Sequence, residues 1–276
     1  MSGLGSRLVR FAYDHRHAVT WLIPPGATLP VRVPGFTILV RCDDWAVGMR
    51  IAVKRRFESH VSEAFRRALA PGMTVVDVGA NVGWYTLLAA SVVGHRGRVV
   101  AIEASAANVE LLRRSVAMNG FGNVEVIHAA VSDREGELRY HADDSNGFVA
   151  TPDEVPGGAA VRAAPLDRLL ADEPRVDVVK MDIEGSEGRA LAGMTVTLAR
   201  HRPLVFTEFS AGALRLVSKM EPADVLAAWR RAGYALRVQP RSGDAASEPQ
   251  DDATILAALP GRGAEHHVDL IASPAR

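Results

Sequence analysis

Cysteine, net charge and long apolar runs are what this sequence has least of. Its single cysteine, Cys42, excludes an intramolecular disulfide and any cysteine-rich metal site, and it suits a reducing cytoplasm. Lysine plus arginine and aspartate plus glutamate balance at 32 each, so the formal net charge is zero. That balance argues against a nucleic-acid binder that relies on overall basic charge. We therefore expect a cytoplasmic protein without a nucleic-acid partner.

The most apolar early stretch, residues 18–33, is interrupted by Pro24, Pro25 and Pro30. No run approaches the roughly 20 apolar residues that span a bilayer, and no apolar segment typical of a signal peptide follows the charged N-terminus. The sequence therefore predicts no membrane partner. The 48% hydrophobic and 23% charged residues are typical of a soluble globular protein with one large domain, alone or with an appendage.

One stretch, residues 75–86, has the pattern of a buried strand, a tight glycine turn and the first turn of a helix. Valines fill its first part, as expected for a strand covered on both faces. Gly79 and Gly83 let a ligand approach the backbone and let the turn adopt a positive φ. N–H groups at the helix start would point at that ligand. The stretch therefore indicates the ligand site of a doubly wound α/β sheet.

The spacing of this turn narrows the class of ligand. The glycines read G-x-x-x-G, with Asn81 where a dinucleotide fingerprint has its middle glycine, and Asp77 lies two residues before the first glycine. Asn81 obstructs a pyrophosphate, and the charge of Asp77 repels it. A zwitterionic methionine moiety fits better, because Asp77 meets its ammonium and the turn N–H groups meet its carboxylate. The alternative is that Asp77 only caps the turn.

Two further strand ends fit an adenosine. Glu103 ends a second buried strand, and an acid there accepts hydrogen bonds from both hydroxyls of a ribose. Its alternative role is that of an acid at the start of the next helix, near Ser105. Ala130 and Val131 follow a third strand, and their small side chains leave room for an adenine ring. A carboxylate that binds a ribose fits NAD and S-adenosylmethionine equally well, because both contain an adenosine.

Charged residues crowd the ends of a fourth strand, residues 176–181, and of a fifth strand, residues 203–209. Lys180 and Asp182 belong to the first group, together with Glu184 and Glu187, and Glu208 belongs to the second. In a doubly wound sheet the carboxyl ends of these strands face the same crevice as the glycine turn. We therefore expect one charged site at this edge.

Three motifs, taken in this order, resemble the FkbM-type methyltransferase family. They are DVGANVG at 77–83, AVSD at 130–133 and KMDIEGSE at 180–187, and the resemblance covers roughly residues 57–210. It implies S-adenosylmethionine as the cofactor and O-methylation of small molecules such as polyketides, sugars and other secondary metabolites. It also implies a Rossmann-like sheet of seven strands, the last of them antiparallel, and residues 234–238 and 267–272 are candidates for the last two.

The predicted function is methyl transfer from S-adenosylmethionine to a hydroxyl of a small molecule. An alcohol acceptor must lose a proton, so a base is expected near the reacting atoms. Asp182 is the first candidate base, and Lys180 and Glu208 are candidates to hold the acceptor or tune Asp182. The cofactor is predicted to contact Glu58, Asp77, Gly79, Ala80, Asn81, Gly83, Tyr85, Thr86, Glu103, Ala104, Ala130, Val131 and Asp182.

The charged residues have alternative interpretations. Lys180 beside two acids is also typical of a structural salt bridge. The oxygens of Asp182, Glu184 and Glu208 would suit magnesium, but the chain has no dense array of ligands, and no metal site is predicted. Glu58 near the start of a helix either faces the cofactor or is exposed.

Three competing functions stay open at this stage. An N-methyltransferase on the same fold usually carries an Asn/Asp-Pro-Pro-Tyr motif after the fourth strand, where this chain has Asp182-Ile-Glu-Gly. A nicotinamide-dependent oxidoreductase is disfavoured by the glycine spacing. A binding module without catalysis is disfavoured by the acid cluster.

The domain prediction is an N-terminal extension, 1–55, followed by a methyltransferase domain, 56–276. The extension is expected to hold a short helix near residues 4–12 and a β hairpin around Pro34-Gly35, and to serve as a lid or as an oligomer contact, which leaves a homodimer open. A small β insertion is expected over residues 137–165. Single helices are expected over 51–69 and 189–200, and a loop over 240–252.

Overall fold

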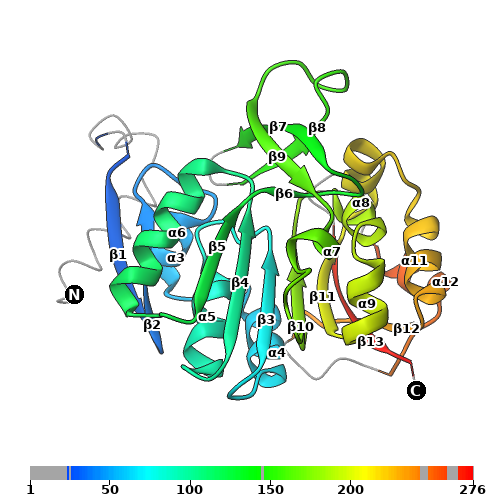
Figure 1. Cartoon of the computed structure of the whole chain (residues 1–276), viewed down its shortest axis with the longest axis horizontal. Coiled ribbons are helices and arrows are strands. Elements are labelled where there is room, and N and C mark those ends of the chain that lie inside the picture. The colour runs from blue at the N-terminus through cyan, green and yellow to red at the C-terminus, as the bar shows by residue number, and fades with distance from the viewer. Residues whose placement is uncertain (1–23, 25, 144–145, 243–247, 260–266, 276) are drawn as a thin grey trace.

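A sheet of seven strands, counted over the described residues, forms the middle of the molecule (Figure 1). This computed structural model describes residues 24, 26–143, 146–242, 248–259 and 267–275. Neighbouring strands are parallel except around β13, which lies antiparallel to β11 and to β12. The strands, in spatial order, are β12 (Tyr234–Val238), β13 (Val268–Pro274), β11 (Leu204–Phe209), β10 (Val178–Met181), β3 (Thr74–Val78), β4 (Arg98–Glu103) and β5 (Val124–His128).

This order confirms the predicted doubly wound Rossmann-like sheet with its antiparallel last strand. From β3 the chain first builds outward through β4 to β5, and it later returns to the other side of β3 to build β10 and β11. The direction of winding therefore reverses between β3 and β10. Open sheets of this kind bind ligands in the crevice at the carboxyl ends of the strands on either side of that reversal.

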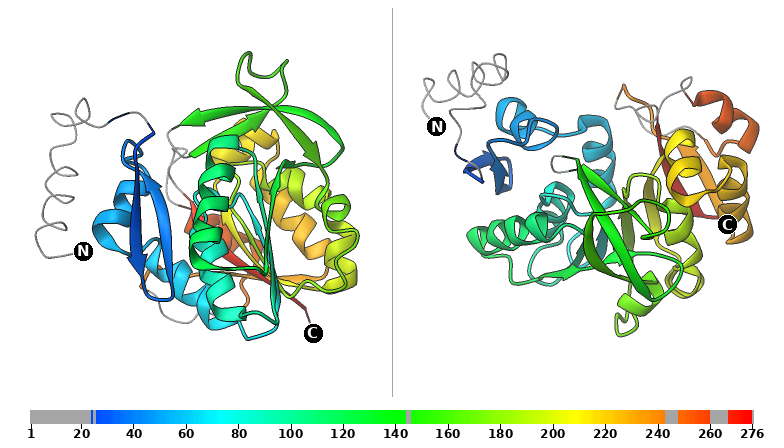
Figure 2. Two further views of the ribbon diagram at one scale, coloured as in Figure 1. Left: turned by 60° about the vertical axis from the view of Figure 1, so that its left-hand side comes forward. Right: turned by 90° about the horizontal axis from the view of Figure 1, so that it is seen from above.

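Helices cover both faces of the sheet (Figure 2). One hydrophobic cluster joins α3, α4 and α5 to the face that carries Val75 and Val99, and a second joins α8, α9, α11 and α12 to the face that carries Val76 and Val100. Successive strand residues point to opposite faces, so a sheet covered twice needs continuous apolar strands. The helices are α3 (Gly48–Lys54), α4 (Ser59–Ala68), α5 (Trp84–Val93), α6 (Ala106–Asn119), α7 (Leu166–Leu169), α8 (Glu187–Ala192), α9 (Thr195–His201), α10 (Ala211–Ala213), the π-helix η2 (Leu214–Ser218), α11 (Pro222–Arg231) and α12 (Asp252–Ala258). Within the described residues, no helix combines the length and apolar character needed to cross a lipid bilayer.

The predicted hairpin consists of β1 (Thr28–Val33) and β2 (Phe36–Arg41), paired antiparallel. Hydrogen bonds attach it to α6: Asn119 Oδ1 accepts from the Thr37 N–H at 2.7 Å, and Ser115 Oγ accepts from the Leu39 N–H at 3.0 Å. The hairpin's role as lid or oligomer contact stays a prediction. The helix predicted near residues 4–12 falls outside the described residues.

A second sheet of the described chain contains the predicted β insertion. Its order is β6-β9-β7-β8, and it lies across the carboxyl edge of the main sheet (Figures 1 and 2). This places the insertion over the crevice. Its strands are β6 (Ala130–Val131), β7 (Gly136–Asp143), β8 (Asn146–Ala150) and β9 (Ala159–Ala164).

The helix predicted over 51–69 is wrong, because the structure divides it into α3 and α4. Arg55 and Glu58 both adopt left-handed backbone conformations, with φ of 52° and 37°. Between them Phe57 packs against Trp84, with ring centroids 6.2 Å apart, and its carbonyl accepts from Ser62 Oγ at 2.7 Å. An aromatic contact and a side-chain hydrogen bond thus outweigh the helical periodicity.

The helix predicted over 189–200 is also divided, into α8 and α9. A Cβ at Gly193 would lie 2.0 Å from the carbonyl oxygen of Ser132, and the Gly193 carbonyl accepts from the Asp167 N–H at 3.0 Å. Asp167 in turn accepts from the Thr197 N–H at 2.7 Å, at the start of α9. The short helix α12, which follows the predicted loop, had no sequence prediction.

The turn after β3 is possible only with glycine at position 79. Gly79 has a φ of 79°, and a Cβ there would lie 1.9 Å from the Asp182 carbonyl oxygen in the chain that follows β10. Because the backbone after β3 passes directly against the backbone after β10, the two halves of the sheet meet at this glycine.

We predict that Gly79→Ala destabilises the protein more than Gly72→Ala does. Gly72 has a similar φ of 83° but no atom within 4 Å of its missing Cβ. Both variants strain a left-handed backbone, at a cost of roughly 1–2 kcal/mol. Gly79→Ala adds the cost of overpacking, roughly 1–3 kcal/mol. Urea denaturation of both variants measures the difference, and equal losses would contradict the close approach.

Candidate active site

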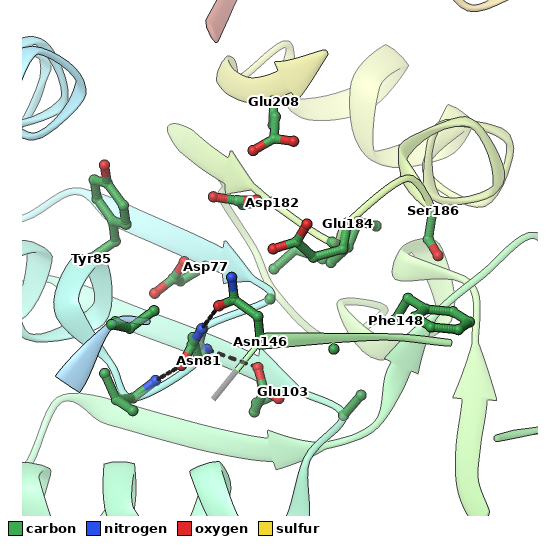
Figure 3. A pocket seen from close by; sticks show the side chains of 18 of the residues that line it. Asp77, Asn81, Tyr85, Glu103, Asn146, Phe148, Asp182, Glu184, Ser186 and Glu208 are labelled. Carbon is green, nitrogen blue, oxygen red and sulfur yellow. Dashed lines mark hydrogen bonds between the residues drawn. The ribbon is translucent and has the colours of Figure 1, made fainter. Parts of the chain in front are cut away.

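A cavity of about 1030 Å³ opens at the carboxyl ends of β3, β4, β10 and β11, beneath the insertion (Figure 3). Ligand pockets usually enclose roughly 300–1,000 Å³, so this one is at the upper end. The predicted site residues that line it are Glu58, Asp77, Gly79, Ala80, Asn81, Tyr85, Glu103, Ala104, Ala130, Val131, Lys180, Asp182 and Glu208.

Two predicted residues, Gly83 and Thr86, are not among the residues that line this cavity. A Cβ at Gly83 would lie 2.3 Å from Cδ1 of Leu112, so this glycine lets the start of α5 pack closely on α6. Thr86 contacts the site indirectly, through a hydrogen bond to Asp77. Gly83 and Thr86 therefore position the residues around the cavity without lining it themselves.

The loop after β3 is tied to the end of β4 by Asn81 and Glu103. Asn81 has a φ of 50°, and its N–H donates to Glu103 Oε2 at 2.8 Å. Glu103 Oε1 accepts from the Ser105 N–H, also at 2.8 Å. Two backbone donors therefore fix both oxygens of Glu103 in place. Burial raises the pKa of this carboxyl, although those two bonds and Asn108 oppose the shift.

Asn81 also connects the loop to the insertion. Its Nδ2 donates to Oδ1 of Asn146, on β8, at 2.9 Å, and its Oδ1 accepts from the Val82 N–H at 2.7 Å. Figure 3 labels both asparagines on the side of the cavity where Glu103 lies. The insertion is thus joined to the cavity through the loop that was predicted to bind the ligand.

Asp77 is buried in the end of β3. Its Oδ2 accepts from Thr86 Oγ1 at 2.5 Å. Burial raises the pKa of Asp77 to about 6, while the bond from Thr86 and the nearby cation of Lys180 limit the shift. The sequence predicts a ligand ammonium at this buried carboxyl, and a cation there would favour its charged form.

Lys180 is the centre of a buried charge cluster. Its side chain is 2% exposed, and Nζ donates to Asp182 Oδ2 at 3.0 Å. Nζ also lies 4.9 Å from the centre of the Tyr85 ring, whose hydroxyl donates to Glu58 Oε2 at 2.7 Å. Burial alone would lower the pKa of Lys180, but Asp182 and Glu58 more than offset this and raise it.

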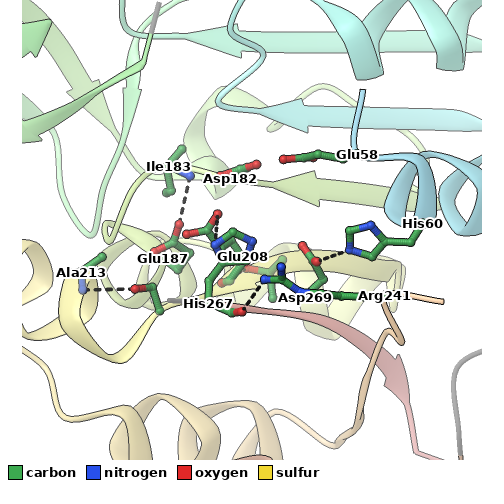
Figure 4. A network of polar contacts seen from close by, with 12 residues as sticks. Glu58, His60, Asp182, Ile183, Glu187, Glu208, Ala213, Arg241, His267 and Asp269 are labelled. Carbon is green, nitrogen blue, oxygen red and sulfur yellow. Dashed lines mark hydrogen bonds and ion pairs between the residues drawn. The ribbon is translucent and has the colours of Figure 1, made fainter. Parts of the chain in front are cut away.

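A second group of acids follows β10 and β11 (Figure 4). Burial raises the pKa of Glu208 well above its usual value, and the negative charge of Asp182 adds to the effect. Glu187 accepts from the Ile183 N–H at 3.0 Å, and burial raises its pKa to about 7. His267 Nδ1 lies 3.6 Å from Glu208 Oε2. Burial thus favours the protonated form of both Glu208 and Glu187.

A model of the methyltransferase FkbM domain matches residues 77–236, more than half of the chain, from the end of β3 through β11. The chain belongs to the FkbM methyltransferase family. It is accordingly an S-adenosylmethionine-dependent methyltransferase, as the sequence resemblance implied. This membership sets aside the nicotinamide-dependent oxidoreductase.

Several solved structures resemble this FkbM methyltransferase at low identity. FkbM from Methylobacillus flagellatus is 17% identical with a TM-score of 0.46, over 81% of this chain and 52% of that one. Precorrin-6y C5,15-methyltransferase from Geobacter metallireducens is 12% identical with a TM-score of 0.44, over 78% and 87%. An rRNA methylase from Streptococcus thermophilus is 12% identical with a TM-score of 0.45, over 80% and 98%. No curated protein matches the chain.

The chemistry of the cavity fits the cofactor of this FkbM methyltransferase. Gly79 leaves the backbone open to close approach, and Asp77 offers a carboxyl to an ammonium. Glu103 keeps spare acceptor capacity on each oxygen for ribose hydroxyls, since a carboxylate has about four lone-pair sites. Ala130 and Val131 form part of the wall. Among the described residues, no group of three or more His, Cys, Asp or Glu side chains is placed to hold a metal.

Sequence reasoning missed several residues of the FkbM methyltransferase site, including Ser186 and His267. Ser186 lies within the KMDIEGSE motif, and His267 directly precedes β13. Arg50 and Lys54 of α3 also line the cavity. Only the KMDIEGSE motif gave a signal for Ser186. The other three depend on where the extension and the last strand pack.

We predict a pH-dependent stability difference between the protein and Asp77→Asn. Because burial raises the pKa of Asp77 from 3.8 to about 6, the folded state favours the protonated acid. That contribution is fully present below pH 4 and is lost as the pH rises through 6. Asp77→Asn has no such loss, so its stability relative to wild type should increase by roughly 2 kcal/mol between pH 4 and pH 7.

Urea denaturation at both pH values measures this difference. Asp251→Asn is the control with the opposite sign, because a hydrogen bond from Thr254 lowers the pKa of exposed Asp251. The wild type should be more stable than Asp251→Asn at neutral pH, and this stability difference should be lost as the pH falls. A difference between wild type and Asp77→Asn that is constant with pH would contradict the burial argument.

Proposed function

We propose that this enzyme transfers a methyl group from S-adenosylmethionine to a hydroxyl of a small molecule, with hydroxylated secondary metabolites as the acceptor class. The observation that carries the proposal is the ion pair of Lys180 with Asp182 at the tip of β10. It holds a carboxylate at the switch point of the sheet, beside the loop that binds the cofactor.

The residues of the β3 and β4 ends hold the cofactor. S-adenosylmethionine supplies an electrophilic methyl group on a sulfonium, and transfer breaks a carbon–sulfur bond and forms a carbon–oxygen bond. Glu103, fixed by the Asn81 and Ser105 N–H groups, receives the ribose hydroxyls. Asp77, fixed by Thr86, receives the ammonium. Rigid support of this kind lowers the entropic cost of alignment.

The carboxylates at the ends of β10 and β11 remove the acceptor proton. Asp182 is the first candidate base, because Lys180 at 3.0 Å fixes its orientation. Glu208 is the second, because it extends from the neighbouring strand β11 into the same cavity. Lys180 itself stays protonated, because neighbouring acids raise its pKa. It therefore acts by positioning Asp182 rather than as a base.

Methylation of a nitrogen or of RNA is the second candidate function, because an rRNA methylase is among the similar folds. The charge of the cavity speaks against RNA. Glu58, Asp77, Asp182, Glu184 and Glu208 all line it, and a phosphate backbone would be repelled by carboxylates at such close range.

We predict that the protein methylates hydroxyl groups of small molecules and leaves RNA unmodified. Incubation with S-adenosylmethionine and a panel of hydroxylated metabolites, amines and a structured RNA tests this. Mass spectrometry should find a product heavier by one methyl group, and fragmentation should locate that group on oxygen. Methylated nitrogen or methylated RNA would overturn the proposal.

We predict that Asp182→Asn lowers kcat by roughly 10²–10⁴-fold, the usual contribution of a positioned acid or base. The affinity for S-adenosylhomocysteine, measured by calorimetry, should stay near the wild-type value because Asp182 faces the acceptor side. Asp224→Asn, on the exposed side of α11, is the matched control and should leave kcat unchanged. Wild-type turnover by Asp182→Asn would remove this residue from the mechanism.

A further inference from the structure

A buried hydroxyl at the edge of the cavity has no partner among the residues that the structure describes. Ser186 is 1% exposed and lines the cavity, and its Oγ makes no hydrogen bond to any of the described residues. Figure 3 shows the Ser186 side chain directed toward the side of the cavity where Phe148 lies. Leaving such a group unpaired costs roughly 1–3 kcal/mol. A bound ligand that donates to or accepts from Oγ would remove that cost.

The wall next to Ser186 is apolar. Phe148 of β8 and Leu216 and Val217 of η2 all line the cavity. Leu216 is 66% exposed, and within the described residues the other exposed large apolar side chains, Met118 and Val196, lie outside the cavity. A π-helix at a cavity wall is frequently functional. We call the space between β8 and η2 the acceptor lobe, and it offers an apolar surface for a ligand.

The acceptor lobe is held open by fixed contacts. Arg189 Nη2 donates to the Val217 carbonyl at 3.0 Å and to Glu154 Oε1, in the connection after β8, at 2.6 Å. Ser218 Oγ donates to the Gly185 carbonyl, next to Ser186. These bonds fix η2 both to the insertion and to the chain that follows β10. A ligand therefore meets a preorganised surface and need not order it.

Carboxylates line the same cavity as the acceptor lobe, whereas most cations of the cavity come from other elements. Asp182, Glu184 and Glu208 extend from the ends of β10 and β11. Lys180 is paired with Asp182, and Arg50 and Lys54 come from α3, on the opposite side of the sheet edge in Figure 1. His267 is close to Glu208. An anionic group in the lobe would thus face like charge, and a cationic one opposite charge.

We propose that the acceptor lobe binds the methyl acceptor, with an apolar part on Phe148 and Leu216 and a polar group on Ser186, and that it selects acceptors with an amino group over acceptors with a carboxylate. The selection concerns a group away from the oxygen that is methylated. This inference rests on the proposed methyltransferase function and adds the chemical class of the substrate. The large cavity volume leaves space for this second ligand.

The test uses three phenols that differ in one end group: tyramine, with an amine, tyrosol, with an alcohol, and para-hydroxyphenylacetate, with a carboxylate. Calorimetry first measures S-adenosylhomocysteine binding, and the saturated protein is then titrated with each phenol at millimolar concentration. We expect tyramine to bind at least about tenfold more tightly than para-hydroxyphenylacetate, with tyrosol between them, because like-charge contacts are strongly disfavoured.

Two variants assign the effect to the lobe. Ser186→Ala and Leu216→Ser should each weaken tyramine binding by about fivefold, the effect of one lost hydrogen bond or apolar contact. Val196→Ser, which changes a similarly exposed apolar side chain on α9, is the matched control and should bind tyramine as the wild type does. All variants should keep the wild-type affinity for S-adenosylhomocysteine.

The outcomes separate the two proposals. The proposal on the acceptor lobe alone would be overturned if S-adenosylhomocysteine binds but the three phenols bind with equal affinity. It would also be overturned if the carboxylate binds most tightly, or if none of the phenols binds measurably. Tyramine binding that is unaffected by both variants would do the same. Absence of S-adenosylhomocysteine binding would overturn the proposed function, and this inference with it.

Discussion

The buried ammonium of Lys180 is the constraint on which the site depends. An isolated charge in the protein interior is costly, and removing one partner of a buried pair costs several kcal/mol. Asp182 forms an ion pair with this ammonium, with Oδ2 of Asp182 3.0 Å from Nζ of Lys180. Glu58, directly before α4, and Asp269 of β13 add their negative charge from farther away. Segments far apart in the sequence therefore converge at the tip of β10, where one cation is compensated by acids from the segment before α4, from the end of β10 and from the last strand.

The same convergence explains why polar residues occupy strained positions around the cavity. Glu58, Asn81 and Glu184 have φ values of 37°, 50° and 51°, and all three line the cavity. Glycine would adopt these conformations without strain. A polar side chain is retained instead, at a cost of order 1–3 kcal/mol each. Asn81 shows what the strained conformation makes possible: its N–H donates to Glu103 and its side chain donates to Asn146.

Local sequence patterns predicted the structural features that depend only on neighbouring residues. The strand, turn and helix around Gly79 and the acid at Glu103 follow from residue spacing within one βα unit, and the structure brings both to one cavity. His267 had no such signal, because only the pairing of β13 with β11 carries it to Glu208. The break between α3 and α4 likewise depends on a tertiary contact of Phe57 with Trp84. Helical periodicity in the sequence contains no information on such a partner.

The acids of the cavity couple ligand charge to protonation. Burial raises the pKa of Asp77 to about 6, and it raises the pKa of Glu208 well above its usual value. A cation placed among them lowers these values again, since it favours the charged form of each acid. Near neutral pH, binding of a sulfonium or an amino group must therefore release protons, whereas binding of an anion must take protons up. The preference for cationic ligands that we propose therefore has its physical source in the burial of these acids.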